Sequence, residues 1–250
     1  MKKIYAVFVA AYLFFLLLTM PASAAVSYPQ PTDNFFVNDF ANVVDPSAEA
    51  AMQTQGEKLY YACKAQVVVV TVESLQGSDI ESYSIGLARE WGIGDQDKDN
   101  GVLLLLSVQD RKVRVEVGYG LEGALPDSKT GRILDTYGTD SFSANDFSTG
   151  LQAVYDSLVN EVYIEYGLEP DADYEPVEDE DSAGVFTVVF VIVVILLILI
   201  FGRNRRGPRF VGPTFWGGPP RGGGGFSGGG GGGFSGGGGG FGGGGSSRGF

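Results

Sequence analysis

An apolar run, Val185–Phe201, divides this 250-residue chain into two parts of very different composition. Thr187 is its single polar residue, and small residues flank it at both ends. At 1.5 Å per residue, about 20 such residues cross a bilayer core of ~30 Å as a helix. A helix that is apolar on all sides could also be buried in a protein core, but a domain of about 130 residues is too small to surround one. The run therefore predicts one transmembrane helix over residues 184–202.

The charges on the two sides of this run predict its orientation. All 30 acidic residues lie between Asp33 and Asp181, together with only nine Lys or Arg, whereas four Arg follow the run between residues 203 and 209. The positive-inside rule places such a basic flank in the cytoplasm and the acidic part outside. A single-pass protein of the cell membrane is therefore expected, with an extracytoplasmic N-terminal domain and a cytoplasmic tail.

The first 24 residues have the order of a secretory signal peptide. Lys2 and Lys3 precede an apolar stretch over 4–18, and Ala22-Ser23-Ala24 offers a small-residue cleavage site. An uncleaved anchor is the alternative, and the small-residue site favours cleavage. Removal of residues 1–24 would place the new N-terminus outside the membrane, in agreement with the charge pattern.

Two further segments have compositions that cannot bury a core. Residues 167–183 are acidic and contain Pro170 and Pro176, which is typical of a solvated linker. Residues 203–250 are rich in Gly and Arg and have few apolar residues, which predicts a disordered tail. The interleaved Arg and Phe of the tail would also allow contacts with lipid head groups or RNA.

Residues 33–166 show the periodicity of an α/β domain. Asp45 and Pro46 are typical of a helix start. The β-branched run over 66–72 and the apolar run over 102–108 predict buried strands, and residues 80–91 between them have helical spacing. A strand–helix–strand unit is right-handed, so we expect the two strands to be parallel.

The next segment, Lys112–Val117, alternates between apolar and charged residues. This predicts an antiparallel hairpin partner for the preceding strand, with three Val inward and Lys112, Arg114 and Glu116 outward. A long helical stripe follows from Phe147 to Val162. The expected fold is an α/β sandwich with a small mixed sheet.

Composition excludes several kinds of chemistry. The chain has no His and a single cysteine, Cys63, which rules out an intramolecular disulfide, Ser-His-Asp triads and the usual zinc sites. The strong excess of carboxylates in the folded domain argues against nucleic acid as its partner and favours cations or basic surfaces.

An acidic cluster is the best candidate for a ligand site. The loop over 95–100 is rich in Asp but fails as an EF-hand, because its Gly comes one position late and Leu106 stands where Glu is required. The hairpin should bring residues 119–122 beside this loop, and like charges gathered in this way favour a bound cation. A merely solvated loop is the alternative. The predicted calcium or magnesium ligands are Asp95, Asp97, Asp99, Asn100, Glu122 and Asp127.

Several motifs together resemble the TPM domain family, which includes the thylakoid acid phosphatase and many bacterial membrane proteins. The resemblance is carried by residues 91–95, 100–105, 118–123, 125–127 and, near the start, 38–41. It implies a Rossmann-like α/β/α sandwich. In some members it implies divalent-metal binding and weak phosphatase activity, and other members resemble accessory subunits of membrane complexes.

Asp39, within the first of these motifs, joins the candidate metal ligands only if residues 35–44 run back along the sheet toward the cluster. Ten extended residues can span ~33 Å, so the distance is feasible.

Two functions are consistent with this sequence. The first is a membrane-anchored binding or accessory module that acts on an unknown membrane or envelope protein. The alternative is a metal-dependent acid phosphatase-like hydrolase, in which the metal would activate water and neutralise phosphate charge. No nucleophile and base pair stands out, so no catalytic residue is assigned.

Overall fold

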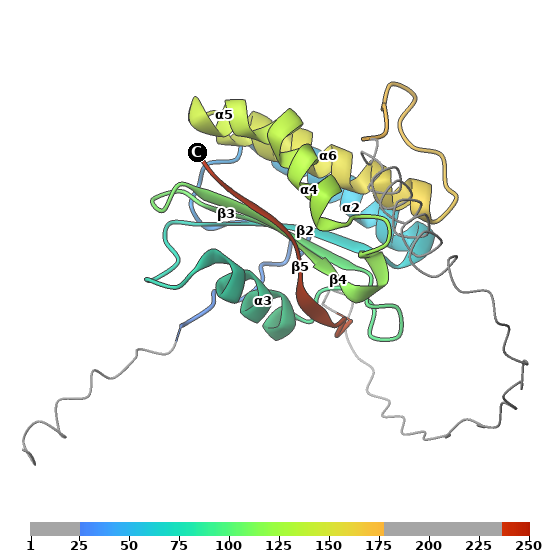
Figure 1. Ribbon diagram of the computed structural model, residues 1–250, viewed down its shortest axis with the longest axis horizontal. Coiled ribbons are helices and arrows are strands. Elements are labelled where there is room, and N and C mark those ends of the chain that lie inside the picture. Colours follow the sequence, from blue (N-terminus) through green and yellow to red (C-terminus); the bar gives the residue numbers. More distant parts are fainter. Residues whose placement is uncertain (1–25, 178–236) are drawn as a thin grey trace, which may run out of the picture.

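The computed structural model describes residues 26–177 and 237–250 (Figure 1). The predicted signal peptide, the predicted transmembrane helix over 184–202 and most of the tail lie outside these ranges. Among the helices that the structure does describe, none is long and apolar enough to cross a bilayer.

One five-stranded mixed sheet forms the centre of the fold, in the order β1-β2-β3-β4-β5. β1 and β2 are parallel to β3, whereas β4 is antiparallel to both β3 and β5. The predicted parallel pair and the predicted hairpin are therefore confirmed. The strands are β1 (Val37–Asp39), β2 (Gln66–Val72), β3 (Gly101–Ser107), β4 (Lys112–Gly118) and β5 (Phe241–Gly249).

Helices cover both faces of this sheet, which gives the expected α/β/α sandwich (Figure 1). α3 (Ile80–Trp91) lies alone on one face. The opposite face is covered by α2 (Pro46–Cys63), α4 (Asp127–Ile133), α5 (Thr139–Ser143) and α6 (Phe147–Glu165). A short 3-10 turn, η1 (Tyr119–Leu121), follows β4, and a π-helical turn, η2 (Leu134–Gly138), joins α4 to α5.

Alternating side chains of the central strands divide the core into two layers. In β2, Val67 and Val69 pack on the side of α2 and α6, whereas Val68 and Val70 pack on the side of α3. All four are fully buried. Successive side chains of a strand point to opposite faces, so a continuous run of β-branched residues is what a strand covered on both faces requires.

The prediction of a disordered tail is wrong for residues 241–249, which form β5 along the free edge of β4. Phe241 is 1% exposed and belongs to the core layer of α3, which also contains Trp91 and Leu103. Ordering a glycine-rich segment costs more backbone entropy than ordering most sequences. Here the hydrogen bonds of the β4 ladder and burial of the Phe241 ring oppose that cost.

This pairing also constrains the position of the tail relative to a membrane. β4 and β5 share one sheet, so residues 112–118 and 241–249 lie on the same side of any bilayer. A single crossing at 184–202 would separate them. Within one molecule, therefore, the tail cannot be cytoplasmic while residues 241–249 pair with β4 outside the membrane.

We expect a cysteine introduced at the exposed Ser247 to react with a membrane-impermeant maleimide from the same side as a cysteine introduced at Tyr61, which is 70% exposed. The parent chain is a suitable control, because its only cysteine, Cys63, is buried. Labelling of the two sites from opposite sides would show that β5 is not docked in cells.

Candidate functional site

The Asp-rich loop before β3 is closed by its own hydrogen bonds. Asp95 Oδ1 accepts from the Asp97 amide at 3.0 Å, and the Asp95 carbonyl accepts from the Asp99 amide at 2.7 Å. Asn100 is fully buried; its Oδ1 accepts from the Asp95 amide at 3.0 Å, and its Nδ2 donates to the Tyr166 hydroxyl at 2.8 Å. Asp97 is exposed. The amide of Asn100 therefore holds the loop against the end of α6.

The end of the hairpin lies against this loop, as predicted. The Gly120 amide donates to the Asp99 carbonyl at 3.0 Å, and a Cβ on Gly118 would lie 2.3 Å from the same oxygen. Glycine at position 118, the last residue of β4, is thus required by a close approach between two backbones. Glu122 and Asp127 follow on the exposed rim of the same end of the sheet.

The C-terminal segment occupies this end of the sheet. The Gly240 amide donates to Asp99 Oδ1 at 2.5 Å, and the Gly245 amide donates to Asp127 Oδ1 at 2.7 Å. The Ser246 hydroxyl also donates to the Asp127 carbonyl at 2.6 Å. Two of the predicted metal ligands, Asp99 and Asp127, therefore bind backbone amides of the C-terminal segment.

The carbonyl groups of the same segment are bound by arginines. Arg89 of α3 donates to the Phe241 carbonyl from Nε at 3.2 Å and from Nη2 at 2.5 Å. Arg114 of β4 donates from Nη2 to the Gly243 carbonyl at 2.9 Å. Carboxylates of the domain thus accept hydrogen bonds from backbone amides of this segment, and guanidinium groups donate hydrogen bonds to its backbone carbonyls.

Arg114 and Glu116 are a buried ion pair and do not point to solvent as the alternation predicted. Their exposed fractions are 4% and 0%, and Arg114 Nε donates to Glu116 Oε2 at 2.8 Å. Ser84 of α3 donates to the same carboxylate at 3.0 Å. Burial raises the pKa of Glu116, and the Arg114 guanidinium opposes that rise. The second face of β4 is thus covered by α3, with Gly243 of β5 completing the contacts of Arg114.

Asp39 lies at the other end of the sheet. It pairs with Thr71, near the end of β2, whereas the loop over 95–100 adjoins the beginning of β2 at Gln66. Its carboxylate accepts from the Val43 and Val44 amides at 3.1 and 2.8 Å. The prediction that Asp39 joins the cluster is wrong, because β1 runs parallel to β2.

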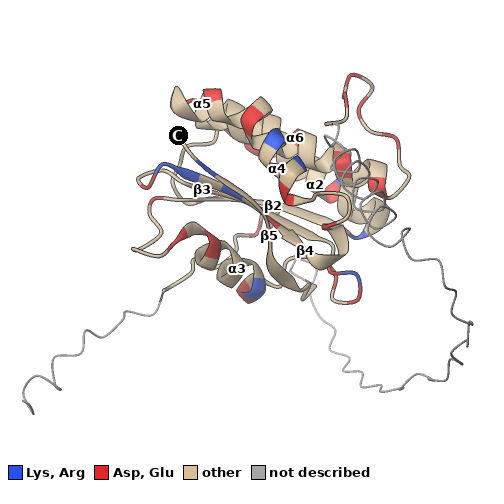
Figure 2. Ribbon diagram, viewed as in Figure 1, with Lys and Arg blue, Asp and Glu red and all other residues tan. Residues whose placement is uncertain are grey.

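The calcium or magnesium site stays a prediction. Over residues 26–177 and 237–250, no group of three or more acidic or cysteine side chains is arranged to hold a metal ion. The fold brings Asp95, Asp97, Asp99, Glu122 and Asp127 to one end of the sheet, but it directs Asp99 and Asp127 toward the amides of the C-terminal segment. Acidic positions are also spread over the surrounding helices and loops (Figure 2).

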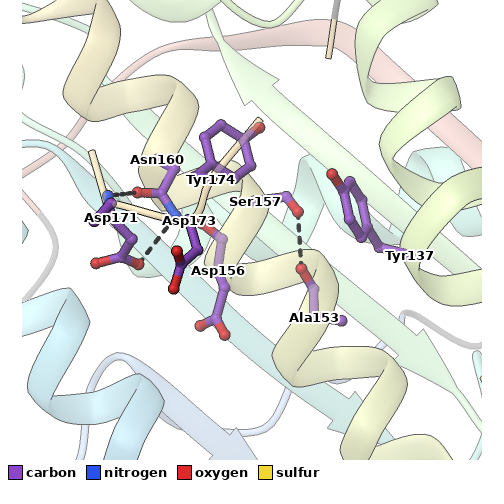
Figure 3. A pocket seen from close by; sticks show the side chains of 9 residues that line it. Tyr137, Ala153, Asp156, Ser157, Asn160, Asp171, Asp173 and Tyr174 are labelled. Atoms are coloured by element: carbon purple, nitrogen blue, oxygen red, sulfur yellow. Dashed lines mark hydrogen bonds between the residues drawn. The ribbon is translucent and has the colours of Figure 1, made fainter. Parts of the chain in front are cut away.

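A separate hollow of about 560 Å³ lies between α6 and the segment that follows it (Figure 3). Asn160 holds that segment, since its Oδ1 accepts from the Asp171 amide at 2.8 Å and its Nδ2 donates to the Asp171 carboxylate at 3.2 Å. Burial raises the pKa of Asp156 to about 6, with a further contribution from the charge of Asp171. No sequence pattern indicates this hollow, because the spacing of Asp156 on α6 resembles that of any solvated helical residue.

The protein is a small α/β domain built as an α/β/α sandwich around a mixed five-stranded sheet. Its edge strand, β5, comes from a distant part of the sequence and lies at the acidic end of the sheet. The family model described as the TPM domain matches residues 37–161, and the chain belongs to this family. Thus the resemblance noted in the sequence is confirmed.

Two of the solved structures that are similar to this chain are N-terminal domains of bacterial proteins. The N-terminal domain of a protein from P. gingivalis has 30% sequence identity and a TM-score of 0.48, covering 56% of this chain and 88% of its own. The N-terminal domain of a protein from Corynebacterium glutamicum has 14% identity and a TM-score of 0.41, covering 65% of this chain and 96% of its own. No curated protein matches the chain.

The raised pKa of Asp156 predicts a pH-dependent stability. A carboxyl whose pKa rises on folding from 3.8 to about 6 stabilises the folded state fully below pH 3.8, and this contribution is lost as the pH rises through 6. Because Asp156 is partly exposed, we expect Asp156→Asn to raise the free energy of unfolding at pH 7.5 by only ~1 kcal/mol. The gain should vanish at pH 3.5.

Urea unfolding at the two pH values measures this effect. Asp173→Asn is the matched control, because Asp173 lines the same hollow and is exposed. If Asp156→Asn and Asp173→Asn give the same pH profile as the parent, the carboxyl of Asp156 is not desolvated.

Proposed function

We propose that this TPM domain is a binding module that takes an extended polypeptide along the edge of β4. The observation that carries the proposal is the chemistry around β5. Asp99 and Asp127 accept from its flanking and internal amides, while Arg89 and Arg114 donate to its carbonyls. Four charged side chains from different parts of the domain thus form hydrogen bonds with backbone groups of one segment.

Such contacts suit recognition of a strand. Hydrogen bonds in which one partner is charged contribute more than neutral ones, about 1.5–3 kcal/mol each. In strand addition, backbone hydrogen bonds supply affinity and pockets for alternate side chains supply specificity. Phe241 fills such a pocket in the core layer of α3.

The place of action that we propose is the cell surface. Residues 1–24, which resemble a signal peptide, and the apolar run over 184–202 support an exported protein attached to the membrane, with the TPM domain outside the cytoplasm. In a molecule whose run over 184–202 crosses the membrane, residues 241–249 lie on the opposite side and cannot pair with β4, so the edge of β4 is open to a partner. The partner would be a membrane or envelope protein that offers an extended segment. The alternative, a metal-dependent phosphatase-like hydrolase, requires calcium- or magnesium-dependent turnover of a phosphate ester.

The test uses the full chain with Phe241→Ala, which removes a buried ring and should release the edge of β4. We expect a labelled peptide of residues 237–250 to bind this variant and to bind the parent much more weakly, since the parent's own segment occupies the edge. Fluorescence anisotropy measures the binding, and near-UV circular dichroism checks that the variant is folded.

A peptide of the same composition in scrambled order is the control. Equal binding of the scrambled peptide, or no binding of either peptide to the folded variant, would contradict the proposal.

A further inference from the structure

We infer that the β4 edge selects glycine in the strand that it binds, so that the glycine run after Phe241 is a recognition sequence. This inference rests on the proposed function and names its ligand class. It follows from what a side chain would meet at each position of β5.

The selection begins at the Phe241 pocket. The ring comes so close to β3 that a Cβ on Gly101 would lie 2.9 Å from its Cζ, and the same Cβ would lie 2.5 Å from the Ile93 carbonyl. Glycine at 101 therefore makes room for the ring. Arg89 then holds the Phe241 carbonyl, which fixes the direction of the strand as it leaves the pocket.

Beyond Phe241 a Cβ would come closest to atoms of the domain at Gly242 and Gly245, and Gly243, with a φ of +96°, is also strained for any residue with a side chain. A Cβ on Gly242 would lie 2.4 Å from the ring of Tyr119. A Cβ on Gly245 would lie 1.9 Å from the Val115 carbonyl, and Gly245 has a φ of +124°, a conformation that is strained for any residue with a side chain. The first obstacle is an exposed ring that can turn aside, whereas the second is backbone of β4 and cannot.

These restrictions distinguish Phe241 from two similar residues in the tail. Phe226 and Phe234 are also embedded in glycine runs, but each is followed directly by serine, Ser227 and Ser235. A serine side chain at the position of Gly242 would meet the Tyr119 ring. The register in which Phe241 fills the pocket is therefore the one that needs no movement of the Tyr119 ring.

The far end of the strand adds a second anchor. Arg248 donates to the Asp135 carboxylate from Nε at 2.6 Å and from Nη2 at 2.8 Å, a bidentate pair that lowers the pKa of Asp135. Phe226 and Phe234 have no arginine seven residues later. The ligand class is thus an extended strand with Phe, glycine one, two and four residues later, and arginine seven residues later.

Single glycine-to-alanine substitutions in the full chain test this inference. Gly245→Ala should reduce the hydrogen-exchange protection of residues 241–249 by roughly tenfold or more, because a backbone obstacle and a strained φ act together. Gly242→Ala should cause a smaller loss. Gly249→Ala is the matched control, since its Cβ would lie 3.8 Å from the Arg111 carbonyl, and protection should stay within about twofold of the parent.

Protection in Gly245→Ala equal to that in Gly249→Ala would overturn glycine selection and leave the proposed function standing. A parent chain that shows no protection over 241–249 would overturn both, because β5 would then not be docked. The ranking Gly245, Gly242, Gly249 from largest to smallest loss is the expected result.

Discussion

The edge of β4 is the constraint on which this arrangement depends. The opposite edge of the sheet is closed by β1, which is only three residues long, but β4 presents a seven-residue edge. Unpaired backbone groups along such an edge attract other strands. Beside them lies the buried pair of Arg114 and Glu116, and a buried pair is more stable when hydrogen bonds reach its remaining polar groups. β5 supplies both the backbone partners and a carbonyl for Arg114.

Much of the fold could be predicted from periodicity. The β-branched run of β2 and the apolar run of β3 indicated strands buried on both faces, and the alternation in β4 indicated the hairpin. The same alternation failed for Arg114 and Glu116. A period of two says which residues share a face of a strand, but it does not say what covers that face. The residues that cover this face of β4 belong to α3 and to a segment more than 120 residues later in the sequence. Local sequence patterns cannot reveal such contacts.

The candidate site was predicted in part for similar reasons. Chain direction along the hairpin placed Glu122 and Asp127 at the same end of the sheet as the loop over 95–100, as the structure confirms. The predicted position of Asp39 was wrong because a sequence contains almost no information about the direction of a three-residue strand. The positions of carboxylates in a sequence also do not show which hydrogen-bond donors will contact them. Here backbone amides of the C-terminal segment donate to Asp99 and Asp127.

Addition of β5 moves the free edge of the sheet outward and changes its character. Gly243 and Gly245 have φ values of +96° and +124°, and the pairing with β4 shifts register between Val117 and Gly118. An outer strand with these interruptions offers a further chain no regular ladder. The glycine-rich strand thus ends the growth of the sheet and protects the domain against edge-to-edge aggregation.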